Sequence, residues 1–215
     1  MEVIEALKRR RSINFFEPGK EVPEEKLTEL LRLANLSPSS FNVQPWRVVV
    51  VRDAERKRTL RTCALDQPKV EEASVVLIMV ADPDFLEKNF PRTLRSWEEL
   101  GYTKPEKREG YMQLARRLYS EKPDALSRRY TALKNTALFA MCLMLAAQGL
   151  GLETHPMDGF DEGCVKKEFG IPEDKIIPML VAVGYLKDGV ELLPRAWRRD
   201  LEEFVSYESY GEQGG

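Results

Sequence analysis

The sequence predicts one domain, or at most two small ones, in which helices and strands are mixed in an α+β or α/β arrangement. Three continuous apolar runs rich in β-branched residues, at 46–52, 74–82 and 176–186, have the composition of buried strands. Helical patterns separate these runs, and neither an internal repeat nor a low-complexity linker divides the chain. A chain of 215 residues is long enough to build a substantial core.

Two helices are predicted before the first strand. The first, at 2–11, places Val3, Ile4 and Leu7 on one face and ends in basic residues, which the helix dipole favours there. The second has Pro23 in its first turn, where a missing N–H costs least. Its apolar residues then follow the i, i+3, i+4, i+7 pattern of an amphipathic helix, at Leu27, Leu30, Leu31 and Ala34.

The rest of the chain is predicted to be mostly helical between its strands. A polar helix is expected at 54–63 and a short one at 161–169. The helix at 135–148 is apolar nearly all the way round, so it should be buried on every side, in a core or at a subunit interface. The segment 84–130 is charged, mostly helical in pattern, and carries four large aromatic residues: Trp97, Tyr102, Tyr111 and Tyr119.

Composition excludes several classes of protein. With 33 basic and 35 acidic side chains, the net charge of −2 argues against a dedicated nucleic-acid binder. Three widely spaced cysteines, Cys63, Cys142 and Cys164, argue against a disulfide framework or a metal site and indicate a reducing compartment. The N-terminus lacks the apolar region of a signal peptide, and the longest apolar run, 137–147, has 11 residues against the ~20 that span a bilayer. We therefore expect a cytoplasmic protein without membrane contact.

The stretch "SPSSFNVQPW" at 37–46 is unusually polar for the entrance to a buried strand. Pro38 and Pro45 already mark a turn there. The four additional uncharged hydrogen-bonding side chains are either internally satisfied, as in many loops, or arranged to bind a polar ligand. They are Ser39, Ser40, Asn42 and Gln44.

Two basic clusters and one glycine-containing turn are further candidates. The sequence "RRRS" at 9–12 is either a solvated helix end or a phosphate site, because guanidinium groups match phosphate oxygens bidentately. A second basic cluster contains Arg195, Arg198 and Arg199. The turn "PMDGF" at 156–160 has a glycine that would let a flat ligand approach backbone N–H groups.

Common catalytic templates are absent from the sequence. It contains no GxGxxG, Walker A, GxSxG or HExxH motif. His155 is the only histidine, and we expect it to be a packed or hydrogen-bonded residue of the turn before Pro156 rather than a base. Met141 and Met144 are expected in the core.

Four motifs in this order resemble the FMN-dependent nitroreductase family. They are RRSxxxF at 10–16, SPSSxNxQPW at 37–46, the apolar helix leading into GLGxxxxPMDGF at 149–160, and RRxLEEFV at 198–205. The resemblance spans residues 2–205 and is weakest over 84–130. It implies an α+β fold with a central mixed sheet flanked by helices, as a single domain over 1–215 and an intertwined homodimer. The segment 84–130 would cover the flavin.

The resemblance also implies an NAD(P)H-dependent FMN oxidoreductase. Hydride from NADH or NADPH would reach flavin N5, and electrons would then pass to a nitroaromatic, a quinone or another small acceptor in ping-pong turnover. No side chain need be catalytic, because the cofactor carries the chemistry. A backbone N–H of Asp158 or Gly159 would point at N5, and the partner subunit would supply the loop from Pro38 to Asn42. The cofactor-binding residues implied are Arg10, Arg11, Ser12, Asn14, Pro38, Ser39, Ser40, Asn42, Asp66, Pro156, Met157, Asp158, Gly159, Arg195 and Arg198.

The chain departs from the family pattern near the pyrimidine end of the flavin. Asn14 and Ala196 stand where members commonly carry a cation, and Asp66 stands where they carry asparagine. Fewer cations and an added carboxylate would disfavour the more negative reduced cofactor, so we expect a lowered potential and an altered acceptor range. That expectation holds only if neither Lys69 nor Arg195 supplies the missing cation.

Three other functions stay open on the sequence alone. The same fold hosts reductive dehalogenation and flavin fragmentation, although the short 53–73 segment leaves little room for a dehalogenase-type insertion. A flavin-binding carrier or sensor without turnover is the second. The third, an interaction protein without flavin, would leave the polar loop and the arginines without a role.

Overall fold

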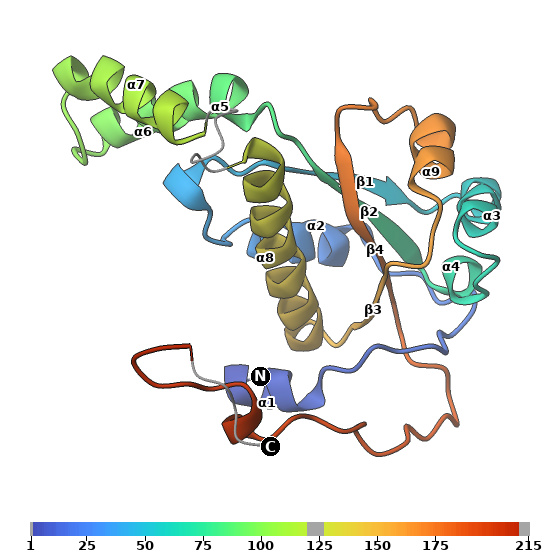
Figure 1. Ribbon diagram of the computed structural model, residues 1–215. Coiled ribbons are helices and arrows are strands. Elements are labelled where there is room, and N and C mark those ends of the chain that lie inside the picture. Colours follow the sequence, from blue (N-terminus) through green and yellow to red (C-terminus); the bar gives the residue numbers. More distant parts are fainter. Residues whose placement is uncertain (1, 120–126, 211–215) are drawn as a thin grey trace.

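The computed structural model describes residues 2–119 and 127–210 (Figure 1). Helices and strands alternate irregularly along the chain, as expected for an α+β protein. The elements are, in order, α1 Val3–Arg9, α2 Glu24–Ala34, the 3-10 turn η1 Ser40–Asn42, β1 Trp46–Val51, α3 Ala54–Cys63, α4 Lys69–Glu72, β2 Val75–Ala81, α5 Phe85–Lys88, α6 Phe90–Glu99, η2 Pro105–Lys107, α7 Arg108–Leu118, α8 Arg128–Gly149, β3 Glu153–Met157, α9 Glu162–Phe169, β4 Ile176–Gly184 and η3 Leu201–Glu203.

Four strands form one sheet in the order β1-β2-β4-β3, and every pairing between them is antiparallel. The three predicted strands are confirmed, but the prediction of a mixed sheet is wrong for these strands; Ser12 and Thr154 add an isolated parallel bridge. Strand β3 was not predicted, because Pro156 and the following turn residues interrupt the apolar pattern. An edge strand tolerates proline, since its outer side forms no ladder hydrogen bond.

Strand β2 divides the core into two layers because its side chains alternate between the two faces of the sheet. Val76 and Ile78 belong to one buried cluster, and Leu77 and Met79 belong to another. Figure 1 shows α3, α4 and α9 on one face of the sheet and α2 and α8 on the other. All seven β2 residues are buried, which explains the uninterrupted apolar run from which this strand was predicted.

Helix α8 begins at Arg128, seven positions before its predicted start, and its N-cap is Ser127, whose hydroxyl accepts from Tyr130 N. Its inner side packs on α2 and the sheet. Its outer side is not covered in one chain, where Leu133 is 39% and Leu138 is 42% exposed. The prediction of burial on every side is therefore wrong for the single chain, and a subunit interface remains its alternative.

By length and hydropathy α8 resembles a membrane span, and it is the one such helix among the described residues. Half of its most apolar 18-residue window is nevertheless buried inside the fold. The buried residues include Phe139, Ala140 and Leu143, which pack against α2 and the sheet. This is the packing of a core helix.

Segment 84–119 forms a small helical layer, α5 to α7, with its own buried cluster. Tyr119 is 2% exposed and packs edge-on against Phe41 and Phe85, so it is a core residue. Trp97, Tyr102 and Tyr111 instead line an open pocket of about 280 Å³. Of the rest of the segment predicted to cover the flavin, residues 120–126 lie outside the described residues, and residues 127–130 form the N-cap and first residues of α8.

The expectation that the chain lacks a disulfide is wrong. Cys63, the last residue of α3, is bonded to Cys164 in the first turn of α9, and Cys142 is free. The two positions are 101 residues apart in sequence but their Cα atoms are 5.5 Å apart. Sequence spacing could not reveal this pair, because only the packing of α3 beside α9 brings it together.

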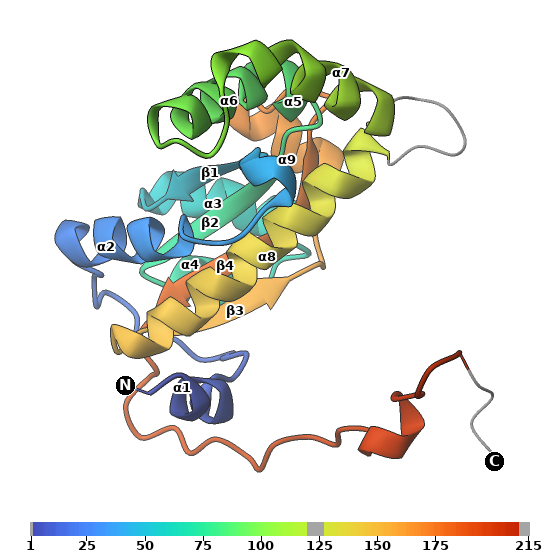
Figure 2. The ribbon, with the colours of Figure 1, turned by 90° about the vertical axis from the view of Figure 1, so that its left-hand side faces the viewer.

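The C-terminal tail passes close to α1 on one side of the sheet. Figure 2 shows the tail after β4 passing below α1 and then continuing away from it, and Arg195 Nη2 donates to Lys8 O at 2.7 Å and Arg10 O at 3.0 Å. Much of the tail is not covered by the chain itself: Leu193 is 81% and Trp197 is 74% exposed. An apolar arm that leaves its own domain is typical of a contact with another molecule.

Candidate functional site

The loop before β1 has a strained backbone. Phe41, Asn42 and Gln44 all have φ between 45° and 52°, in the left-handed region that non-glycine residues seldom adopt. Each such residue costs about 1 kcal/mol or more and persists only where its surroundings hold it. Backbone strain of this kind concentrates at binding sites, which favours a functional reading of the loop over a simple turn.

Helix α6 and its N-cap residue Asn89 hold this loop in place through three side-chain hydrogen bonds. Asn89 Nδ2 donates to Val43 O at 2.8 Å and to Gln44 O at 3.0 Å, and Thr93 Oγ1 donates to Asn42 O at 3.0 Å. Within the loop, Ser39 Oγ accepts from Gln44 N at 3.0 Å. The loop is therefore a rigid part of the surface, with Pro38 and Asn42 exposed and the serines between them partly exposed.

Four arginines gather where α1 meets the tail. The pKa of the Arg10 guanidinium is lowered first by burial and then by the positive charges of Arg195, Arg198 and Arg11, against the single carboxylate of Glu153. Arg11 Nη2 also donates to Pro194 O at 3.4 Å, so the tail backbone helps to fix the cluster. An excess of positive charge assembled by the fold is the electrostatic requirement for binding a phosphate group.

Residues 12–14 run alongside β3. Ile13 N donates to Thr154 O at 3.0 Å, and His155 Nδ1 donates to Ile13 O at 3.0 Å. The hydroxyl of Thr154 is fully buried and has no hydrogen-bond partner among the described residues. His155 is thus hydrogen-bonded as predicted, although it belongs to a strand and not to a turn.

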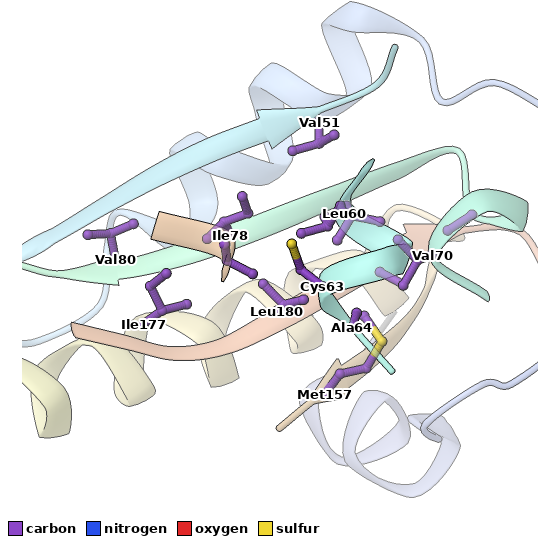
Figure 3. Packing of buried hydrophobic residues seen from close by; sticks show 14 of the residues in the cluster. Val51, Leu60, Cys63, Ala64, Val70, Ile78, Val80, Met157, Ile177 and Leu180 are labelled. Carbon is purple, nitrogen blue, oxygen red and sulfur yellow. The ribbon is translucent and has the colours of Figure 1, made fainter. Parts of the chain in front are cut away.

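The turn after β3 presents backbone rather than side chains. Met157 is 3% exposed and lies in the core beside Ala64 and Cys63, so only its main chain can face a ligand (Figure 3). Asp158 is exposed, and Gly159 O accepts from Gln67 Nε2 at 2.8 Å. A Cβ at Gly159 would lie 3.4 Å from both Gln67 and Leu65, so the turn is closely packed.

A lowered flavin potential was expected only if neither Lys69 nor Arg195 supplied the missing cation, and this condition is not met. Lys69 Nζ lies 2.8 Å from Asn14 Oδ1, so a cation stands beside the position that lacks one. Asp66 pairs with Arg61 at 2.7 Å, which offsets the added carboxylate. Arg195 lies against α1 instead. Lys69 had been named only as a possible source of this cation, and Arg61 and Gln67 were missed as site residues, because their contacts depend on the fold of residues 64–69.

The predicted residues fall into two groups at opposite ends of α8. Ser40 N faces Asn135 Oδ1 at 3.4 Å in the N-terminal half of this helix, whereas Gln148 near its C-terminus pairs with Glu153 beside the arginines. Thirteen residues of helix separate these anchors, about 20 Å. Figure 2 shows the two regions apart, with the loop near the upper half of α8 and α1 below its lower end. One chain therefore does not bring the groups together.

The model of the nitroreductase family matches residues 7–185. The chain belongs to the nitroreductase family. Relatives cover most of its length: a protein of Bacillus subtilis assigned as NAD(P)H nitroreductase YdgI is 33% identical over 87% of this chain and 90% of its own, and the NADH dehydrogenase of Thermus thermophilus is 36% identical over 82% and 83%.

Solved structures show the same fold. A protein from Exiguobacterium sibiricum, assigned as a nitroreductase and solved in complex with FMN, superimposes with a TM-score of 0.86 at 27% identity, covering 97% of this chain and 98% of that one. The nitroreductase family protein from Streptococcus pneumoniae has a TM-score of 0.73 at 25% identity, over 95% and 99% of the two chains. The predicted nitroreductase-like α+β fold is confirmed.

As the only histidine of this nitroreductase, His155 offers a direct test of the site's electrostatics. Burial, and then the nearby Lys69 charge, lower its pKa to about 4, against which the bond to Ile13 O acts weakly. We expect its single imidazole Cε1–H resonance to titrate near pH 4 in NMR spectra. A midpoint near the ordinary 6.5 would contradict the buried, neutral state.

The same shift predicts how stability varies with pH. Between pH 6.5 and about 4 the unfolded chain binds a proton at His155 that the folded chain does not, so stability should fall as the pH falls through this window. The slope contributed by one proton is at most ~1.4 kcal/mol per pH unit. A His155→Gln variant, which keeps a donor but does not titrate, should lose this component.

Proposed function

We propose that this protein is an FMN-containing, NAD(P)H-dependent oxidoreductase that reduces a nitroaromatic, a quinone or another small acceptor. The observation that carries the proposal is the cluster of Arg10, Arg11, Arg195 and Arg198, in which the other three positive charges lower the pKa of Arg10 and the carboxylate of Glu153 opposes them. Such a cluster fits a phosphate group, and family membership and the FMN complex of the Exiguobacterium relative support the proposal that this is the phosphate of FMN.

The residues present fit an FMN molecule in their chemistry. The arginines and the exposed Ser12 would hold the phosphate and ribityl hydroxyls, and Lys69 with Asn14 would face the polar pyrimidine edge. The turn at Asp158 and Gly159 offers backbone N–H donors, with Met157 buried beneath it. When bound, FMN accepts a hydride from NADH or NADPH and passes electrons to the acceptor.

The protein's own contribution is position and charge. Gln67 fixes the Gly159 carbonyl, so the turn presents its N–H groups in one orientation. Lys69 supplies a positive charge where the reduced cofactor is most negative. His155 is kept neutral at pH 7 by its lowered pKa, so it holds Ile13 and does not exchange protons with the substrate. No side chain needs to act as an acid, base or nucleophile.

A homodimer completes this site in the proposal. The loop from Pro38 to Asn42 lies far from the arginines of its own chain, so the partner's copy would close the cofactor. The exposed outer side of α8 and the apolar tail are two surfaces that such a dimer would bury. Helix α6, which braces the loop, would bring the aromatic pocket of Trp97, Tyr102 and Tyr111 toward the cofactor, where a planar acceptor could stack. We place this dimer in the cytoplasm.

The first test is the visible spectrum of the purified protein. We expect flavin absorbance that bleaches on anaerobic addition of NADPH or NADH, which also identifies the donor. A yellow protein that neither donor bleaches would favour a flavin carrier or sensor. A colourless protein that does not take up added FMN would contradict the proposal.

Replacing Arg10 by alanine should weaken FMN binding roughly 10-fold, because a charged hydrogen bond is lost while the neighbouring arginines remain. The dissociation constant can be measured from the quenching of flavin fluorescence. Arg58→Ala, an exposed change on α3, is the matched control and should leave the constant unaltered. Equal affinity of the Arg10 and Arg58 variants would place the phosphate elsewhere.

A further inference from the structure

The Cys63–Cys164 disulfide lies directly behind the turn that the proposed function places against the flavin. Cys63 ends α3 and precedes the loop 64–68, and Cys164 stands in the first turn of α9, which follows the turn 158–160. The disulfide therefore links the residue before the loop 64–68 to the helix that follows the turn 158–160. Neither loop belongs to the sheet, so the contacts at this junction determine how the two loops lie relative to each other.

Two hydrogen bonds reinforce the same junction. Asp161 N donates to Cys63 O at 2.8 Å, and Gln67 Nε2 donates to Gly159 O at 2.8 Å. The Asp161 side chain also caps α9 by accepting from Cys164 N at 2.8 Å. The segment 159–164, which continues directly from Asp158, is thus held to the 63–67 region by the disulfide, by one backbone hydrogen bond and by one side-chain hydrogen bond.

The loop on the other side of the junction is strained and depends on such contacts. Leu65 and Asp66 are consecutive non-glycine residues with φ of 51° and 56°. A backbone of this kind is retained only where its surroundings hold it. Releasing Cys63 from Cys164 removes one of these constraints and should increase the motion of both loops.

The two cysteine residues differ in exposure. Cys63 is 3% exposed and lies among the residues of the buried cluster drawn in Figure 3, whereas Cys164 is partly exposed on α9. We therefore take Cys164 as the cysteine that an external thiolate attacks, with Cys63 as the leaving thiolate. Accessible disulfides are the labile and regulatory ones, and in reducing compartments disulfides are mostly transient.

We propose that Cys63 and Cys164 form a reversible thiol–disulfide site that controls the rigidity of the Asp158–Gly159 turn and, resting on the proposed function, the affinity for FMN. The reductant is a dithiol. One of its thiolates attacks Cys164 Sγ and breaks the S–S bond, and its second thiol resolves the mixed disulfide. The dithiol leaves as a cyclic disulfide, having given two electrons and two protons to form two cysteine thiols. An oxidised dithiol reverses the reaction.

The experiment compares the protein equilibrated with oxidised or with reduced dithiothreitol. Iodoacetamide labelling after denaturation should count one thiol, Cys142, in the oxidised form and three in the reduced form. Peptide-level hydrogen exchange should be faster after reduction in 64–68 and 157–162. The FMN dissociation constant should rise about three- to ten-fold on reduction.

Cys164→Ser should reproduce the reduced state without reductant, in both exchange and affinity, and should no longer respond to dithiothreitol. Cys142→Ser is the matched control and should behave as the parent protein does. A count of three thiols in the oxidised form would overturn the proposal. A count of one thiol in the oxidised form would also overturn it if hydrogen exchange were identical in the oxidised and reduced forms. If no FMN binds in either form, the proposed function fails. The thiol count and the hydrogen exchange still test whether the Cys63–Cys164 disulfide controls the rigidity of the turn.

Discussion

Replacement of Lys175 by methionine is expected to lower the free energy of unfolding by about 3 kcal/mol. Lys175 is 7% exposed and lies between α9 and β4, where its ammonium contacts Asp82 at 2.9 Å, Asp84 at 2.8 Å and Asp174. Asp82 is itself 5% exposed. Removing one partner of a buried ion pair costs about 3–5 kcal/mol because the other charge stays buried, and Lys88, 3.2 Å from Asp82, keeps the effect at the lower end.

The acid dependence of stability should identify the cause. Hydrogen bonds from Lys175 and then Lys88 lower the pKa of Asp84 to about 2. Burial alone would raise the pKa of Asp82, but hydrogen bonds from Lys175, Asp84 N and Lys88 leave it below its ordinary value. Carboxylates with lowered pKa stabilise the fold above their ordinary pKa, and this contribution is lost as the pH falls from about 4 to about 2.

Denaturant unfolding at several pH values between 5 and 2 tests this account. Stability of the parent protein should fall through the window, and that of the Lys175→Met variant should fall less, so that the two converge in acid. Lys104→Met, at an exposed position, is the matched control and should follow the parent. A constant difference at every pH would mean that lost packing, rather than lost charge pairing, destabilises the variant.

Sequence patterns predicted the elements whose side chains face one environment along their whole length. The run from Val75 to Ala81 is buried on both faces, and the amphipathic pattern from Leu27 to Ala34 matches the side of α2 that packs on α8. Strand β3 has neither character: Glu153 and His155 face one side, and Pro156 breaks the pattern. Its place in the sheet follows from the partner strand β4, which sequence periodicity does not reveal.

The candidate site was predictable where its residues lie in one stretch, and not where distant stretches meet. The polar loop at 37–46 stood out by its own composition. The bond between Cys63 and Cys164, and the approach of Lys69 to Asn14 across 55 positions, arise only when α3, α4 and α9 pack on the sheet. A sequence pattern compares each position with its neighbours in sequence. It therefore shows that position 14 carries no positive charge, but not that Lys69 lies beside it.

Lys69→Met should lower the midpoint potential of bound FMN by about 30–60 mV. Burial lowers the pKa of Lys69, and its Nζ lies 2.8 Å from Asn14 Oδ1, where the proposed function places the pyrimidine edge of the flavin. A charge within about 4–6 Å changes the balance between two charge states by roughly one to two pKa units, or ~1.4–2.8 kcal/mol. For a two-electron couple, 30 mV corresponds to about 1.4 kcal/mol. Potentiometric titration measures the shift directly.

The exchanged pair Asn14→Lys with Lys69→Asn is the decisive companion to this variant. It returns the cation to position 14 and keeps the amide–ammonium contact, now reversed, so the potential should return to within about 15 mV of the parent, half of the smallest shift expected above. Asn14→Lys alone adds a second cation and should raise the potential. If Lys69→Met binds FMN at an unchanged potential, the ammonium does not act on the cofactor, and the contact with Asn14 only supports the loop. Recovery in the exchanged pair would show that position 69 replaces position 14 in supplying the charge.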